Sequence, residues 1–189
     1  MGTSETQTGG TPGGAPLTPA ARPAPGEHPE PAGRPKGVPA PDRWRYARHL
    51  DRLAAAGAAG VKGEAGAVAA VLRDPDPVMA QSAVVTHLDR RAVRLAPGAA
   101  FRDWARALHS VLEGHAFPAL RLREWTLLKA IAGGGSWSAA ELKAASDWCQ
   151  RTAVLSAAPD EALALLAASA RTRRVRTTAA RRLHRRATV

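Results

Sequence analysis

Cysteine, lysine and most aromatic residues are scarce in this chain of 189 residues. Cys149 is the single cysteine, which excludes an intramolecular disulfide framework and a zinc site built from several thiolates. No stretch approaches the roughly 18 consecutive apolar residues of a membrane-spanning helix, so no membrane partner is expected. The first 14 residues hold no basic residue and no apolar run, which predicts a protein without a secretory signal and with a cytoplasmic location.

Acidic residues are missing from the last part of the chain, and this absence produces most of the formal net charge of +11. No acidic residue follows Thr172, and eight arginines lie between Arg171 and Arg186. Only four basic residues of the whole chain are lysines, and the bias toward Ala, Arg, Gly and Pro is typical of a GC-rich coding genome, which predicts a bacterial source. The arginine content alone is therefore weak evidence for nucleic-acid binding.

Residues 1–42 have almost nothing to bury. They contain no aromatic residue and two large aliphatic residues, Leu17 and Val38, but ten of the fifteen prolines. Such a composition cannot offset a backbone entropy cost of about 1–2 kcal/mol per residue. We therefore expect a disordered Pro/Gly-rich tail at 1–42 and a folded domain at 43–189.

From Asp42 onward, apolar residues recur every three to four positions, which predicts helices and no strand. Start signals include Asp76 followed by Pro77, and the capping box formed by Ser138 and Glu141. The eight predicted helices start at or next to Asp42, Glu64, Pro77, Ala99, Pro118, Ser138, Pro159 and Thr172.

Three of these starts are equally spaced. Pro77, Pro118 and Pro159 are separated by 41 residues each, and each opens the first helix of a predicted pair. A period near 40 with two helices per unit is typical of HEAT and armadillo arrays. Stretch 72–79, with Asp74-Pro75, resembles the turn of HEAT-like repeats, and stretch 174–183 is similar to their second helix. The resemblance implies an all-α, right-handed α-solenoid of about four antiparallel helix pairs, and it implies binding surfaces without a shared catalytic chemistry.

Candidate site residues are the cations that such an array would leave exposed. On the last helix Val175, Ala179 and Leu183 face inward, which leaves arginines on the solvent side, where guanidinium groups suit phosphates or carboxylates. Cations of preceding second helices extend this surface. The predicted partner- or anion-binding residues are Arg174, Arg181, Arg182, Arg185, Arg186, Arg102, Arg106, Lys143 and Arg151. The alternative interpretation of the last helix is a solvated end cap of the array.

Motifs for chemistry are absent. The six histidines show no metal-binding spacing with a carboxylate, and Gly133-Gly134-Gly135 lacks the strand and the Lys-Ser/Thr pair of a phosphate loop. We expect no cofactor, no metal and no catalytic residue. The leading hypothesis is a non-enzymatic adaptor that docks a partner protein through the array or through its Arg-rich last helix.

Two alternatives remain open. The first is a nucleic-acid-binding protein that contacts phosphates through the same basic surface. The second is an enzyme of the helical-repeat DNA glycosylase kind, because those enzymes use tryptophan and aspartate on a basic concave face and Asp147 and Trp148 are adjacent here. The sequence leaves the identity of the partner and the oligomeric state undetermined.

Overall fold

The computed structural model describes residues 42–156 and 158–188. They belong to one compact unit that begins at Ala40, and the predicted disordered tail lies outside the described residues apart from Asp42. The described residues form nine α-helices and one 3-10 helix without any strand, which confirms the all-α prediction. The elements are α1 (Asp42–Ala58), α2 (Val61–Val71), α3 (Pro77–Arg94), α4 (Ala99–His109), η1 (Ser110–Leu112), α5 (Ala116–Ala132), α6 (Ala139–Ala144), α7 (Asp147–Leu155), α8 (Asp160–Ser169) and α9 (Arg173–Ala187).

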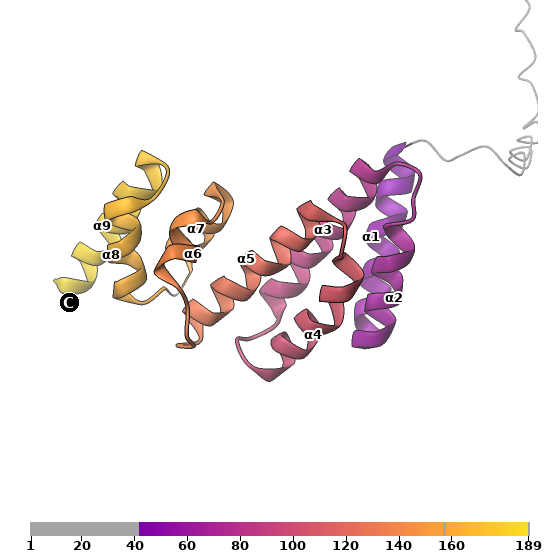
Figure 1. Ribbon diagram of the computed structural model, residues 1–189, viewed down its shortest axis with the longest axis horizontal. Coiled ribbons are helices and arrows are strands. Elements are labelled where there is room, and N and C mark those ends of the chain that lie inside the picture. Colours follow the sequence, from indigo (N-terminus) through magenta and orange to yellow (C-terminus); the bar gives the residue numbers. More distant parts are fainter. Residues whose placement is uncertain (1–41, 157, 189) are drawn as a thin grey trace, which may run out of the picture. The chain divides into compact units, whose positions relative to one another are not determined.

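The odd-numbered helices pack on one another in chain order. α1 packs against α3, α3 against α5, α5 against α7, and α7 against α9 (Figure 1). The even-numbered helices form a second set, in which α2 packs against α4 and α6 packs against α8. α4 also packs against α5, and this contact places the site described below.

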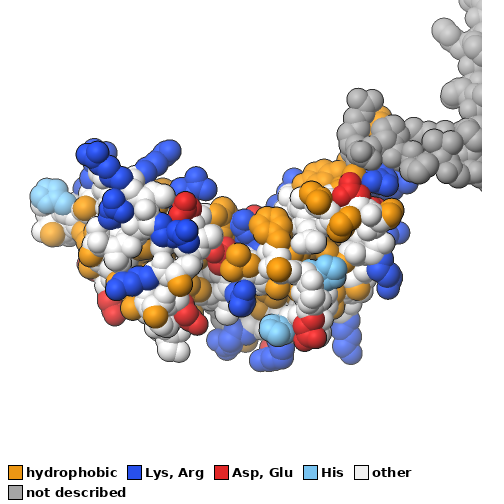
Figure 2. All heavy atoms as spheres, turned by 45° about the horizontal axis from the view of Figure 1, so that its top comes forward, with side chains coloured by type: hydrophobic (Ala, Val, Ile, Leu, Met, Phe, Trp, Pro, Cys, Tyr) orange, Lys and Arg blue, Asp and Glu red, His pale blue; other side chains and the backbone are white. Residues whose placement is uncertain are grey.

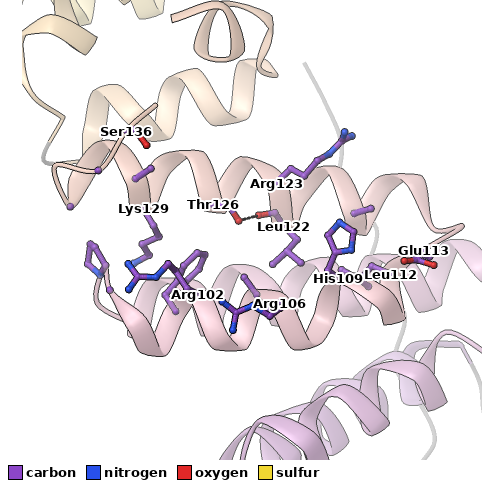
Figure 3. Close-up of a pocket in the computed structure, with 18 of the residues that line it drawn as sticks. Arg102, Arg106, His109, Leu112, Glu113, Leu122, Arg123, Thr126, Lys129 and Ser136 are labelled. Carbon is purple, nitrogen blue, oxygen red and sulfur yellow. Dashed lines mark hydrogen bonds between the residues drawn. The ribbon is translucent and has the colours of Figure 1, made fainter. Parts of the chain in front are cut away.

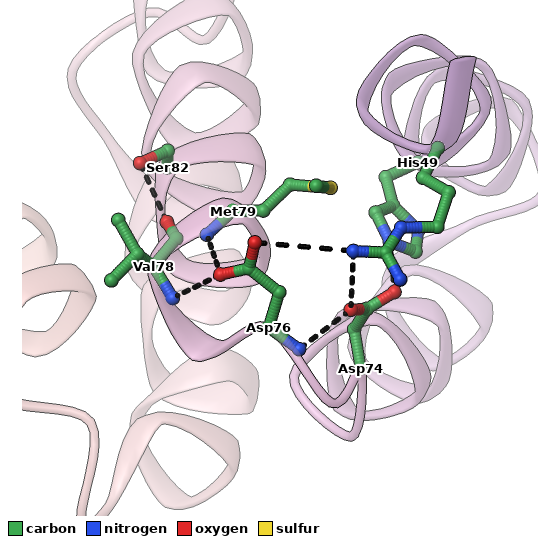
Figure 4. Close-up of polar contacts among 7 residues, drawn as sticks. His49, Asp74, Asp76, Val78, Met79 and Ser82 are labelled. Carbon is green, nitrogen blue, oxygen red and sulfur yellow. Dashed lines mark hydrogen bonds and ion pairs between the residues drawn. The ribbon is translucent and has the colours of Figure 1, made fainter. Parts of the chain in front are cut away.

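The start of α3 shows how the sequence sets a helix boundary. Asp76 accepts hydrogen bonds from two backbone N–H groups of the first turn, at 3.1 and 3.0 Å, and Pro77 occupies the first helical position. The neighbouring Asp74 accepts a 2.8 Å bond from His49 Nε2 of α1, and Arg45 lies 3.9 Å from both carboxylates (Figure 4). The turn between α2 and α3 is thereby attached to α1.

The core of the first half is held by a buried carboxylate. Glu64 of α2 is fully buried and accepts hydrogen bonds from His87 Nε2 of α3, at 2.7 Å, and from Trp104 Nε1 of α4, at 2.8 Å. Arg91 Nε of α3 reaches its second oxygen at 3.3 Å. Because buried polar groups are costly when unpaired, this cluster fixes how α2, α3 and α4 meet.

The structure corrects the predicted sixth helix. The sequence predicts one helix from Ser138 onward, but the chain breaks at Ala145 and Ser146 and continues as two helices, α6 and α7. The Ser146 side chain caps α7 through Cys149 N at 3.2 Å, and its own N–H donates to the buried Glu124 of α5 at 2.9 Å. Buried Gln150 of α7 donates to two backbone carbonyls at the end of α6, at 3.0 Å each. These contacts stabilise the break.

The extra helix changes the register of the predicted repeat. Pro77 is the first residue of α3 and Pro118 the third residue of α5, so these two prolines lie near the starts of adjacent odd-numbered helices. Pro159 precedes α8 instead, which packs against α6 and α9 and belongs to the even-numbered set. The 41-residue correspondence therefore ends after α5.

Candidate functional site

A groove of about 960 Å³ runs between α4 and α5 (Figure 3). Its wall and floor include apolar side chains from both helices and from η1: Phe101, Ala105, Leu112, Ala119 and Leu122. The connection between α5 and α6 closes one end, and the residues around Glu113 close the other. Small side chains at Ala105 and Ala119 leave the space that larger residues would fill.

Close packing of two loops defines the closed end near α6. A Cβ at Gly133 would lie 2.8 Å from Cβ of Pro97, which is too close for any side chain at position 133. The next residue, Gly134, has a φ of +69°, which L side chains rarely adopt. Glycine at position 133 therefore allows the α5–α6 connection to pack closely against the α3–α4 connection.

The rim of the groove is strongly cationic. Arg102 and Arg106 line it from α4, and Arg123 and Lys129 line it from α5, whereas Glu113 is the single carboxylate among the lining residues (Figure 3). The three arginines are exposed. Arg106 forms an ion pair with Asp103 at 3.0 Å, but both side chains are largely in water, so this pair holds the guanidinium weakly. The groove thus combines an apolar floor with four cations on its two sides.

Lys129 differs from the other three cations because it is partly buried. Its Nζ donates to the carbonyl of Leu95 and lies 5.8 Å from the Phe101 ring centroid and 5.7 Å from that of Trp125. Burial lowers the pKa of Lys129 below its ordinary value. This lysine both attaches α5 to the α3–α4 connection and places positive charge at the inner end of the groove.

The five predicted arginines of α9 separate into two rows with different surroundings. Arg182 Nη1 donates to the carbonyls of Val154 and Ser156, the latter at 2.9 Å, and Arg186 Nη1 donates to the Ala158 carbonyl at 2.9 Å and to Asp160 at 2.6 Å. Both side chains therefore bind the connection between α7 and α8.

Arg174, Arg181 and Arg185 form the second row and are exposed. They are spaced at i, i+7 and i+11, so they lie on one face of α9. Figure 2 shows Lys and Arg side chains gathered over the α8–α9 end of the described residues. We call these three residues the exposed arginine row.

The remaining predicted cations lie elsewhere. Lys143 on α6 and Arg151 on α7 are exposed and do not line the groove. Of the nine predicted residues, the structure brings Arg102 and Arg106 together in the groove and places five on α9. Arg123 and Lys129 complete the groove and were missed by the sequence analysis. Their spacing with Ala119 and Leu122 along one face of α5 is the signal that could have identified them.

The residue pair behind the glycosylase alternative has other contacts. Asp147 is half exposed and lies 3.3 Å from Arg171 Nε. Trp148 packs edge-on against Trp125, with ring centroids 5.4 Å apart, and the Arg121 guanidinium stacks 3.4 Å above its ring. An ion pair and a packed aromatic cluster account for both side chains.

Reactive and metal-binding groups are not clustered in the described residues. Burial raises the pKa of the Cys149 thiol to about 12, which keeps it protonated and unreactive at neutral pH. Within 42–156 and 158–188, no three His, Cys, Asp or Glu side chains are placed to hold a metal ion.

None of the helices that the structure describes is long and apolar enough to cross a membrane. Comparisons of the chain with protein families, with curated proteins and with solved structures gave no significant match, so the functional argument rests on this geometry.

Proposed function

We propose that this protein is a non-enzymatic interaction module that binds a segment of a partner protein in the groove between α4 and α5. The observation that carries the proposal is the combination of an apolar floor with four cations along the rim. Protein interfaces place apolar anchors in desolvated pockets and surround them with a polar rim. The complementary partner segment carries large apolar side chains next to carboxylates.

The packing order supports a repeat architecture of the HEAT-like kind for this module. Chain-order packing of α1, α3, α5, α7 and α9, with α2–α4 and α6–α8 as a second set, is compatible with the two layers of a helical-repeat array. With the break at Ser146, the chain divides into four helix pairs and a terminal helix, α9. Arrays of this kind present extended surfaces for partners, and the groove lies on such a surface.

The test uses the intact chain and a library of displayed random peptides of about 16 residues, long enough to follow both helices. We expect enrichment of peptides that combine Leu, Ile or Phe with Asp or Glu. Their affinity, measured by fluorescence anisotropy, should fall at least tenfold in the double variant Arg102→Glu and Arg123→Glu. The matched control is Arg48→Glu with Arg52→Glu, two exposed residues of α1 outside the groove.

The proposal fails if no peptide family is enriched. It also fails if the enriched peptides bind the groove variant as tightly as they bind the control variant. Circular dichroism and the thermal midpoint of both variants establish that the substitutions leave the fold intact.

The exposed arginine row favours a second candidate function, the binding of nucleic-acid phosphates. Arg181 and Arg185 are one helical turn apart, about 6 Å along the axis, so both guanidinium groups can reach phosphates of one nucleic-acid backbone. Because Arg182 and Arg186 are engaged within the protein, the proposed contact involves Arg174, Arg181 and Arg185.

Salt titration tests this second candidate. If the row binds duplex DNA, replacing all three residues by glutamine should reduce the slope of log affinity against log salt by about 0.9 for each lost contact. A wild-type chain that shows no binding to duplex DNA at low salt, or a slope that the substitutions leave unchanged, would rule it out.

A further inference from the structure

The groove has the length of a short helix and runs along two helices at once. α4 contributes 11 residues, which correspond to about 16 Å of axis. Lining residues extend along it from Pro97 and Gly98 at one end to His109 and Glu113 at the other. A ligand that fills the groove therefore spans about three helical turns.

Hydrogen bonding in the groove decides the backbone conformation of its occupant. The walls are helices, whose backbone groups are already paired within each helix, so no sheet edge is available. The polar side chains on the walls are mostly donors, namely three arginines and Lys129. The Thr126 hydroxyl is engaged with the Leu122 carbonyl at 3.0 Å.

An extended peptide in this groove would bury N–H groups that find no regular row of acceptors. Acceptor atoms among the lining side chains are scattered over Glu113, Ser136, the Thr126 hydroxyl and the neutral forms of His109 and His115. Each buried unpaired backbone group carries a substantial penalty. A helix pairs its own N–H and carbonyl groups and avoids this penalty, so the groove favours a helical occupant.

The charges define the surface of that helix. Arg102 and Arg106 are one turn apart on α4, Arg123 stands on the opposite side on α5, and Lys129 adds positive charge at the inner end, where its Nζ donates to the Leu95 carbonyl. A helix lying between them meets cations on both flanks and apolar side chains beneath. Its apolar stripe therefore has carboxylates on each side.

We infer that the groove between α4 and α5 binds an amphipathic helix of about three turns whose apolar stripe is flanked by Asp or Glu on both sides. This inference rests on the proposed function and specifies the class of partner segment. It makes the groove a site where a partner helix adds to the array beside α4.

The test compares four designed peptides of about 14 residues, of which the first two share one composition of Leu, Ala and Glu. The first has leucines at i, i+3, i+4 and i+7 with glutamates beside them, and the second has the same residues in strict alternation. A third is the first peptide with a central Ala replaced by Pro, and a fourth carries Lys in place of Glu. Binding to the full chain is measured by fluorescence anisotropy, and peptide helicity by circular dichroism with and without the protein.

We expect the first peptide to bind and to gain helicity on binding, and the other three to bind at least tenfold more weakly. The Arg102→Glu and Arg123→Glu variant should weaken binding of the first peptide about tenfold, whereas the Arg48→Glu and Arg52→Glu control should not. Both variants are checked for an unchanged thermal midpoint.

Two results would overturn the inference in different ways. If the alternating peptide binds as tightly as the first, or if the first binds without a gain in helicity, the occupant is not a helix and the proposed function stands. If neither peptide binds and the displayed library is not enriched either, the proposed function fails as well.

Discussion

At the scale of the residue, the buried Glu64 joins three helices, because its carboxylate accepts hydrogen bonds from side chains of α3 and α4. Burial opposes its ionisation, but the hydrogen bonds from His87 and Trp104 and the charges of His87 and Arg91 together hold the pKa of Glu64 below its ordinary value. The carboxylate therefore stays charged in the folded protein at pH values at which it becomes protonated in the unfolded chain.

This lowered pKa gives a pH dependence with a defined sign. Between the folded-state pKa and the unfolded value of about 4.3, only the unfolded chain takes up the proton, so acid favours unfolding. The contribution of Glu64 is complete above about pH 4.3 and is lost as the pH falls through the lower folded-state value.

We predict that Glu64→Gln lowers the free energy of unfolding by about 1–3 kcal/mol near pH 7, because a charged acceptor of three donors is removed. The difference from the wild type should shrink in acid. Urea denaturation at several pH values measures both effects, with the exposed Glu141→Gln as the control. If the difference in unfolding free energy between the wild type and Glu64→Gln stayed constant with pH, it would contradict a lowered pKa of Glu64 in the folded protein.

Asp89 also affects how the stability of the protein depends on pH. The contribution of Glu64 is therefore obtained from the difference in unfolding free energy between the wild type and Glu64→Gln at each pH. Burial raises the pKa of Asp89 although Trp125 Nε1 donates to it at 2.7 Å. A raised carboxyl pKa acts in the opposite direction, because it makes the folded state take up the proton first. Subtracting the variant from the wild type removes this contribution.

The sequence could not identify Glu64 as a core residue. It occupies a short helix rich in alanine and valine, and a charged residue in such a helix is expected to be exposed to solvent. Its partners lie 23, 27 and 40 positions away, so only the packing of α3 and α4 reveals them. Trp104 and Leu108, by contrast, lie four positions apart in an apolar helical pattern, which predicts that they share the inward face, and both are buried.

At the scale of the element, the arginines of α9 differ in their surroundings: Arg182 and Arg186 donate to backbone carbonyls, whereas Arg181 and Arg185 are exposed. Its predicted N-cap, Thr172, accepts from Val175 N at 3.3 Å, and Val175 and Ala179 are buried as expected. The sequence cannot distinguish Arg182 and Arg186 from Arg181 and Arg185, because the two pairs are adjacent in the chain and have the same spacing. Only the position of the α7–α8 connection in the fold decides which pair contacts its carbonyls.

We predict that Arg182→Ala with Arg186→Ala lowers the free energy of unfolding by about 2 kcal/mol, since backbone carbonyls near the end of α7 lose their donors. Arg181→Ala with Arg185→Ala removes the same charge and should change it by less than about 0.5 kcal/mol. Denaturant unfolding of the two double variants makes the comparison. Equal losses of stability would show that the two rows do not differ.

The break between α6 and α7 escaped the sequence analysis for a similar reason. The capping motif at Ser138 was recognised, and Ser138 Oγ accepts from Glu141 N at 3.4 Å. The second cap, at Ser146, depends on Glu124 and Gln150, whose contacts join α5, α6 and the α8–α9 connection. Local patterns locate a helix start, but tertiary contacts decide whether a long apolar pattern is interrupted.

At the scale of the whole molecule, the boundary of the folded unit is a testable property. The composition of residues 1–42 predicts that this segment adds no buried apolar surface, and the compact unit begins at Ala40. We predict that a chain starting at Ala40 has the same thermal midpoint as the full chain, within about 1 °C, because no buried surface is lost. Differential scanning calorimetry measures both, and a clear decrease would show that the preceding residues contribute to folding.

The positions of the tryptophans allow two parts of the helical domain to be followed separately. Trp104 is buried against Glu64 between α2 and α4, whereas Trp125 and Trp148 form one ring pair between α5 and α7. In a variant that keeps Trp104 alone, emission reports on the helices around Glu64, and in a variant that keeps only Trp125 and Trp148, it reports on the contact between α5 and α7. Comparing the two signals during denaturation distinguishes a chain that melts in one cooperative step from one that opens helix pair by helix pair.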